Sequence, residues 1–261
     1  MEAAEGARTF QAGGAAYDSF MGRYSGPLAT VFADAAGVAA PQTAVDVGCG
    51  PGALTAELVR RLGAEAVTAV DPTEPFVEAC RRRNPGVDVR LGRAEELPLE
   101  DGRFDATLAQ LVLHFVTDPA AAAREMRRVT RPGGVVGACV WDADGMTMLR
   151  VFREAVRATD GEAPIGSDPR AFGRKGEIAD LFRSAGLEDV RDGALDVETT
   201  YADFDEFWNP FLTGIGPAGD YVASLDADRQ ASFREVLRTR VGSPAGPFTL
   251  TARAWYATGR A

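Results

Sequence analysis

The sequence is poor in the residues that most often build metal sites and disulfide networks. Histidine occurs once, as His114, and the three cysteines, Cys49, Cys80 and Cys139, are far apart and form no C-x-x-C pair. The pattern gives no support for a structural zinc site or a disulfide framework. We therefore expect no metal at the functional site and a reducing, cytoplasmic location.

Long apolar runs are also missing. No stretch of 18 or more apolar residues occurs, so no membrane span is expected. The first ten residues lack a basic start followed by an apolar core, so they do not resemble a signal peptide. A formal net charge of −10 would repel a polyanion at long range, so nucleic acid is not an expected partner. We interpret two arginine clusters, at 81–83 and 124–131, as solvated helix ends rather than anion-binding patches.

Short apolar runs alternate with amphipathic segments from residue 43 onward. Strands are predicted at 44–47, 66–70, 87–91, 104–108, 135–141, 187–200 and 249–258. Helices are predicted at 52–62, after Thr73 as a capping residue, and from Asp118-Pro119 to the Pro-Gly-Gly at 132–134. This alternation predicts an α/β fold with a doubly wound sheet. The last run follows no helical crossover of the earlier type, so its strand is expected to pair antiparallel.

Three segments, 1–36, 143–175 and 202–247, fall outside the alternation and are rich in aromatic residues and glycine. We expect one domain over 1–261, with a core of about 40–142, 176–201 and 248–258 and these segments as helical lids over the carboxyl edge of the sheet. Some of their aromatic side chains should be core, and others are expected to line an apolar acceptor pocket. The candidates are Trp141, Phe172, Phe207, Trp208 and Phe211.

A glycine-rich loop at 45–52 follows the first predicted strand and opens the first predicted helix. Glycine lets the backbone approach a ligand closely, and the free N–H groups of a helix start attract anions. Asp71, at the end of the second predicted strand, can accept hydrogen bonds from both hydroxyls of an adenosine ribose. The same spacing fits a dinucleotide. Asp46 favours S-adenosylmethionine (SAM) instead, because a carboxylate repels a pyrophosphate but attracts an ammonium and a sulfonium.

The sequence resembles the class I SAM-dependent methyltransferases, in particular the small-molecule enzymes of the ubiquinone and menaquinone biosynthesis branch. The matching stretches, in order, are VDVGCGPG at 45–52, VDP at 70–72, AEELP at 94–98, FDATLAQLVLHF at 104–115 and REMRRVTRPGG at 124–134. The resemblance implies a Rossmann-like seven-stranded sheet of order 3-2-1-4-5-7-6, with strand 7 antiparallel.

The resemblance also implies roles for individual residues. Gly48 and Gly50 would lie under the methionine part of SAM, with Asp46 holding the loop or reaching the ammonium group. Asp71 would bind the ribose. The remaining cofactor-binding candidates are Pro72, Ala94 and Glu95 near the adenine, Gln110 beside the amino-acid tail, and Tyr17 and Arg23 near the methionine carboxylate.

Two residues of the matching stretches carry open interpretations. His114 could be a general base or a packing residue at a helix start. Arg93 stands where the family often has an acid that accepts from the adenine amino group. A guanidinium has only donors, so Arg93 is expected to turn to solvent or to Glu95 or Glu96.

The predicted function is methyl transfer from SAM to an apolar or aromatic small molecule. The reaction would be an in-line displacement at the methyl carbon by oxygen, nitrogen or carbon, without a metal. Two alternatives stay open: a methyltransferase fold with a non-methylating role, such as a SAM-retaining cyclase or binding protein, and an NAD-dependent oxidoreductase. The chain is expected to act as a monomer or homodimer, with neither nucleic acid nor a membrane as partner.

Overall fold

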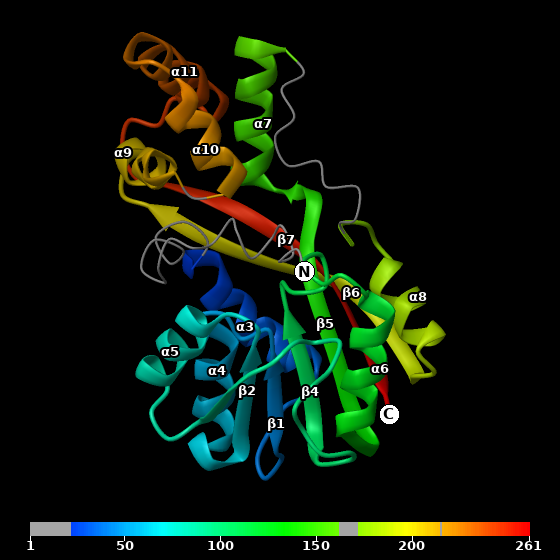
Figure 1. The fold of residues 1–261 in the computed structure, drawn as a ribbon. Coiled ribbons are helices and arrows are strands. Elements are labelled where there is room, and N and C mark those ends of the chain that lie inside the picture. Colours follow the sequence, from blue (N-terminus) through cyan, green and yellow to red (C-terminus); the bar gives the residue numbers. More distant parts are fainter. Residues whose placement is uncertain (1–21, 162–171, 215) are drawn as a thin grey trace.

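The computed structural model describes residues 22–161, 172–214 and 216–261, and its centre is a seven-stranded sheet of order β3-β2-β1-β4-β5-β7-β6 (Figure 1). The strands are β1 (Ala44–Val47), β2 (Val67–Asp71), β3 (Asp88–Leu91), β4 (Phe104–Gln110), β5 (Thr130–Met146), β6 (Glu188–Tyr201) and β7 (Phe248–Arg260). β1 to β5 run parallel, and β7 pairs antiparallel with both β5 and β6. The predicted order and the antiparallel seventh strand are confirmed.

The helices connect and cover these strands. They are α3 (Arg23–Ala35), α4 (Ala53–Leu62), α5 (Glu74–Arg83), α6 (Pro119–Val129), α7 (Thr147–Asp160), α8 (Glu177–Ser184), α9 (Phe204–Trp208), α10 (Gly216–Ser224) and α11 (Ala227–Arg240), with the 3-10 turns η2 (Ala64–Ala66) and η3 (Asn209–Thr213).

Helix starts and ends follow local chemistry, with two departures from the prediction. Asp118 accepts a hydrogen bond from the Ala121 N–H, and the proline after it occupies the first turn of α6. α6 ends at Val129, before the Pro-Gly-Gly, which lies inside the long strand β5. Thr73 precedes α5 but its side chain does not cap the helix, and its N–H donates to Asp71.

α7, between β5 and β6, and α9–α11, between β6 and β7, lie beyond the carboxyl edge of the parallel strands, at the top of Figure 1, whereas α8 lies beside α6 and packs on β6 and β7. The aromatic side chains of the layer at the top pack on one another. Phe152 of α7 stacks on Phe211 at 4.7 Å between ring centroids, and Phe233 of α11 meets Phe152 edge-on at 5.2 Å. Phe207 and Trp208 belong to the same buried cluster. These rings are the core of the helical layer.

No helix in the described part of the chain has the length and apolar character needed to cross a membrane. The three cysteines are all buried and are free thiols.

Candidate cofactor-binding site

A cavity of about 330 Å³ opens at the carboxyl edge of the sheet, where β1, β2 and β4 end. Open α/β sheets bind ligands at the point where the strand order reverses, and here the order reverses between β1 and β4. Within the described chain the lining runs from Ser25 to Thr117. The candidate aromatic residues of the acceptor pocket are not in this lining: Trp141 and Phe172 pack against the buried core clusters, and Phe207, Trp208 and Phe211 belong to the core of the helical layer. The acceptor pocket itself stays a prediction.

The loop after β1 forms the floor of the cavity. Gly48 and Gly50 have φ values of 72° and 52°, in the left-handed region that glycine adopts without strain. The N–H groups of Gly48 and Cys49 both donate to the Val70 carbonyl, which ties the loop to β2. A β-carbon on Gly48 would lie 2.5 Å from a methyl of Val112. The loop therefore needs glycine there for its conformation and for space.

Asp71 connects the end of β2 to the glycine-rich loop. One carboxylate oxygen accepts from the Gly50 N–H and the other from the Thr73 N–H, both at 2.9 Å. Burial raises the pKa of Asp71, and these hydrogen bonds oppose the shift. A carboxylate has about four acceptor positions, so both oxygens can still receive ribose hydroxyls.

Asp46 is the fully buried acid at the cavity wall. Thr55 of α4 donates its hydroxyl to the Asp46 carboxylate at 2.6 Å. Burial raises the pKa of Asp46 from 3.8 to about 7, and the Thr55 hydrogen bond only partly offsets it. Near neutral pH the group is balanced between the neutral acid and the anion. A nearby cation would therefore decide its charge.

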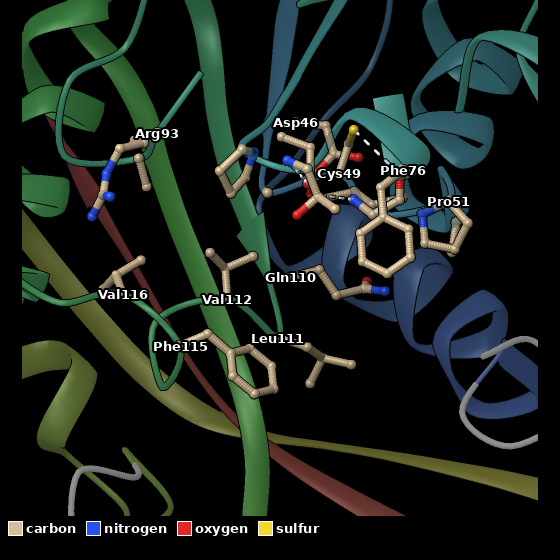
Figure 2. A pocket seen from close by; sticks show the side chains of 18 of the residues that line it. Asp46, Cys49, Pro51, Phe76, Arg93, Gln110, Leu111, Val112, Phe115 and Val116 are labelled. Atoms are coloured by element: carbon tan, nitrogen blue, oxygen red, sulfur yellow. Dashed lines mark hydrogen bonds between the residues drawn. The ribbon is translucent and has the colours of Figure 1, made fainter. Parts of the chain in front are cut away.

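Gln110 closes the cavity from the end of β4. Its amide nitrogen donates to the Ser25 carbonyl of α3 at 2.9 Å. Its side-chain oxygen is buried and has no hydrogen-bond partner among the described residues. An unpaired buried acceptor is costly unless a ligand supplies the donor. Figure 2 shows Gln110 between the Asp46–Cys49 side of the cavity and the loop after β4.

That loop, residues 111–117, supplies the apolar wall. Leu111 has a φ of 62°, which is uncommon for a residue with a β-carbon, and its N–H donates to the Cys139 carbonyl of β5. Phe115 is 44% exposed, the kind of surface that a ligand covers. The Thr117 N–H donates to the Glu95 carboxylate at 2.9 Å, which joins the two loops at the mouth of the cavity.

Arg93 behaves as the sequence predicts. Its guanidinium pairs with Glu95 at 3.2 Å and its side chain is 58% exposed, so its head lies toward solvent and an acid. Figure 2 places it at the side, apart from the other labelled residues.

Eight of the predicted cofactor-binding residues lie together in the lining: Asp46, Gly48, Gly50, Asp71, Pro72, Ala94, Glu95 and Gln110. Arg23 lies elsewhere, because its guanidinium pairs with Glu206 at 2.7 Å and stacks over the Tyr201 ring. Tyr17 lies outside the described residues. His114 is not in the lining, and its ring packs on Phe115 at 3.9 Å.

Sequence reasoning missed part of the lining, including Ser25, Phe76, Val112 and Phe115. Val112 and Phe115 lie in the quoted stretch 104–115, but only the turn at Leu111 directs them into the cavity. Nothing in the sequence joins Ser25 to Gln110, 85 residues away. In the described part of the chain, no group of three or more His, Cys, Asp or Glu side chains is placed to hold a metal ion.

Comparison with known proteins identifies relatives of this chain. Residues 45–137 match the family model described as a methyltransferase domain. Nocamycin O-methyltransferase of Saccharothrix syringae is 30% identical over 241 residues, covering 83% of this chain and 84% of that protein. An uncharacterized methyltransferase of Mycobacterium bovis is 44% identical over 104 residues, 40% of this chain. The chain spans only 41% of that protein's length, and 35% of a Streptomyces fradiae transposon protein with 41% identity.

A solved structure from Anaeromyxobacter dehalogenans, described as a candidate type II methyltransferase, has the same fold. It superposes with a TM-score of 0.65 at 24% identity, covering 89% of this chain and 95% of that one. The fold, the site and the full-length relative together establish the class: the chain belongs to the class I SAM-dependent methyltransferases.

Proposed function

We propose that this protein binds SAM in the cavity at the carboxyl edge and transfers its methyl group to a neutral, largely apolar small molecule. The observation that carries the proposal is the pairing, in one cavity, of a ribose-binding acid with two buried acceptors for an ammonium group. Asp71 accepts from the Gly50 N–H of the glycine-rich loop, and Asp46 and the unpaired Gln110 oxygen belong to the same lining.

The chemistry of the lining orients the cofactor. Asp71 would accept from the ribose hydroxyls, and the adenine would lie against Pro72 and the backbone of Ala94. The ammonium of the methionine part would supply the donor that the Gln110 oxygen lacks and the positive charge that ionises Asp46. Leu111 and Phe115 would supply the apolar surface of the same cavity.

The charges and the apolar wall define the acceptor class. The lining contains three acids, Asp46, Asp71 and Glu95, and one base, Arg93, which is already paired with Glu95. An anionic acceptor would be repelled by this set, whereas the apolar residues of the 111–117 loop suit a neutral or aromatic molecule. Relatives named for nocamycin and ubiquinone biosynthesis O-methylation support a small-molecule acceptor.

The reaction needs little from the protein beyond positioning. Bound SAM would supply the methyl group: a lone pair of the acceptor would form a bond to the methyl carbon while the carbon–sulfur bond breaks to a neutral thioether, and the methylated acceptor would release its proton to water. Alignment of the three atoms and exclusion of water supply most of the acceleration. The role of His114 as a base stays a prediction, and we assign no proton transfer to it because it is not in the lining.

Two measurements test the proposal. In isothermal titration, S-adenosylhomocysteine should bind at micromolar concentration and NAD should not; the reverse would point to an oxidoreductase. Turnover of SAM with a labelled methyl group should then transfer label to neutral aromatic or polyketide-like acceptors. Tight S-adenosylhomocysteine binding without labelled product from any acceptor of that class would favour a SAM-retaining role.

A further inference from the structure

The connection between β3 and β4, residues 92–103, carries one wall of the cofactor cavity. Ala94 and Glu95 line the cavity, and a turn follows in which the Glu96 N–H donates to the Arg93 carbonyl. Residues 97–101 then cross to α6 on the other side of the sheet edge. The position of Ala94 therefore depends on what holds the residues just after it.

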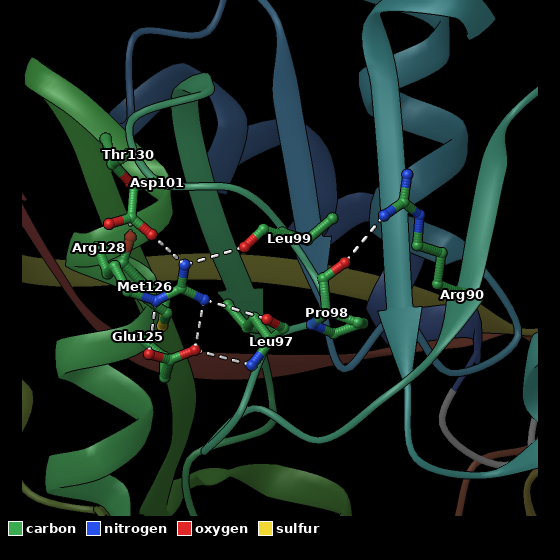
Figure 3. A network of polar contacts seen from close by, with 9 residues as sticks. All are labelled: Arg90, Leu97, Pro98, Leu99, Asp101, Glu125, Met126, Arg128 and Thr130. Carbon is green, nitrogen blue, oxygen red and sulfur yellow. Dashed lines mark hydrogen bonds and ion pairs between the residues drawn. The ribbon is translucent and has the colours of Figure 1, made fainter.

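Arg128 of α6 holds them with three of its N–H donors, and its two others go to Glu125 (Figure 3). Its guanidinium donates to the Leu97 carbonyl at 3.1 Å and to the Leu99 carbonyl at 2.9 Å, and it pairs with Asp101. Leu97 and Leu99 are 4% and 7% exposed, so little water can reach them to replace these hydrogen bonds. Arg128 was expected to lie solvated at a helix end, but it instead clamps the backbone of residues 97–101 to α6.

Glu125, one turn earlier on α6, completes the clamp. Its carboxylate receives both the Nε and Nη2 donors of Arg128 at 2.7 Å, in the bidentate geometry that fixes a guanidinium. The same carboxylate accepts the Leu97 N–H at 2.8 Å. Both backbone groups of Leu97 are therefore bound to one ion pair.

From the other side, Arg90 of β3 donates to the Pro98 carbonyl at 2.8 Å, and a β-carbon on Gly92 would lie 2.6 Å from the Pro98 ring. The connection is therefore seated against β3 and clamped to α6, and only two residues lie between Ala94 and Leu97. Displacement of Leu97 must move the backbone that faces the adenine.

We infer that Arg128 and Glu125 are positioning residues for adenine recognition: they act through Leu97 to place the backbone at Ala94. This inference rests on the proposed function, because it assigns the adenine of SAM to that wall. Neither residue lines the cofactor cavity, so their effect on affinity is indirect.

The test measures binding of two probes to full-length variants by isothermal titration. S-adenosylhomocysteine spans the whole cavity, and 5′-methylthioadenosine contains only the adenine and ribose half. In Arg128→Ala, affinity for both probes should fall by the same factor, of at least about tenfold. Arg124→Ala removes an exposed arginine of the same helix and should change neither affinity.

Glu125 gives a graded second series that does not depend on Arg128→Ala folding. Glu125→Gln keeps an oxygen for the Leu97 N–H and should lose affinity only a few-fold. Glu125→Ala removes the acceptor of the Leu97 N–H and of the Arg128 guanidinium. Its affinity for both probes should therefore fall as much as that of Arg128→Ala. Thermal unfolding followed by circular dichroism gives the temperature at which each variant begins to unfold. The titrations are done below that temperature.

The outcomes separate the inference from the proposed function. Folded Arg128→Ala and Glu125→Ala proteins that bind S-adenosylhomocysteine as tightly as the unmodified protein would overturn the inference alone. A loss for S-adenosylhomocysteine well above that for 5′-methylthioadenosine would also overturn it, because the clamp would then act on the methionine end. Failure of the unmodified protein to bind either probe would overturn the proposed function and this inference with it.

Discussion

Substitution of Asp46 by asparagine should stabilise the empty protein while it weakens cofactor binding. In the folded protein burial raises the pKa of this carboxyl from 3.8 to about 7. An unfolded chain ionises it near 3.8, so the contribution of Asp46 to stability is full below pH 4 and is lost as pH rises to 7. At 1.36 kcal/mol per pKa unit, the penalty above pH 7 is on the order of 4 kcal/mol.

Asparagine has the same shape, does not ionise, and can still accept the Thr55 hydroxyl that bonds Asp46. Unfolding by urea without cofactor should therefore show little difference between Asp46→Asn and the unmodified protein at pH 4.5. The variant should become more stable by up to about 4 kcal/mol at pH 8. Thr55→Val is the matched control, because it removes the hydroxyl but leaves the ionisable group.

Cofactor binding should change in the opposite direction. The ammonium of SAM favours the ionised carboxylate, so Asp46→Asn should bind S-adenosylhomocysteine more weakly at pH 8 by about 2 kcal/mol, the usual size of a charge-assisted hydrogen bond. In the unmodified protein the affinity should fall as pH decreases below 7, because binding must then release a proton. Equal stability of the two proteins at pH 8 would show that burial does not raise this pKa. Equal affinity at pH 8 would remove Asp46 from the cofactor site.

Three further predictions concern the rest of the cavity. Asp71→Ala should weaken S-adenosylhomocysteine binding by roughly 2–3 kcal/mol, measured by titration, since it removes acceptors from two buried hydroxyls; an unchanged dissociation constant would refute the ribose assignment. Gly48→Ala should abolish binding, because the new methyl meets Val112 at 2.5 Å in a left-handed conformation, and the addition of Val112→Ala should restore binding only in part; full restoration would show that the clash alone matters. Arg93→Ala should change the affinity by less than about 1 kcal/mol, as expected for an exposed ion pair with Glu95; loss of binding would mean that Arg93 holds a negative group.

The sheet was the most predictable part of the molecule because its signals are local. Short apolar runs mark buried parallel strands, and Asp118-Pro119 starts a helix by chemistry contained in a few residues. The strand order and the proposed role of Gln110 came from the resemblance to a family, whereas the position of Asp71 at the end of a strand already predicted its ribose role. Alternation alone says which residues form strands but not which strands are neighbours.

The errors have one physical cause, which is contact between distant segments. Arg23 pairs with Glu206, 183 residues away, and Arg128 bonds the carbonyls of Leu97 and Leu99 from another element. Aromatic content likewise did not show whether a ring such as Phe211 faces a ligand or another ring. Helical spacing reports that a face is buried but does not identify what covers it.

Within the described part of the chain, the residues that line the cofactor cavity all fall between Ser25 and Thr117, in the first half of the sequence. The helical layer of α7 and α9–α11 has its own aromatic core and contributes no described residue to that lining. Exchange of residues 147–160 and 204–240 for the equivalent segments of a relative would consequently leave every described cofactor contact in place. A chimaera of this kind would exchange the acceptor specificity in one step. Its affinity for S-adenosylhomocysteine would show whether cofactor binding is independent of the helical layer.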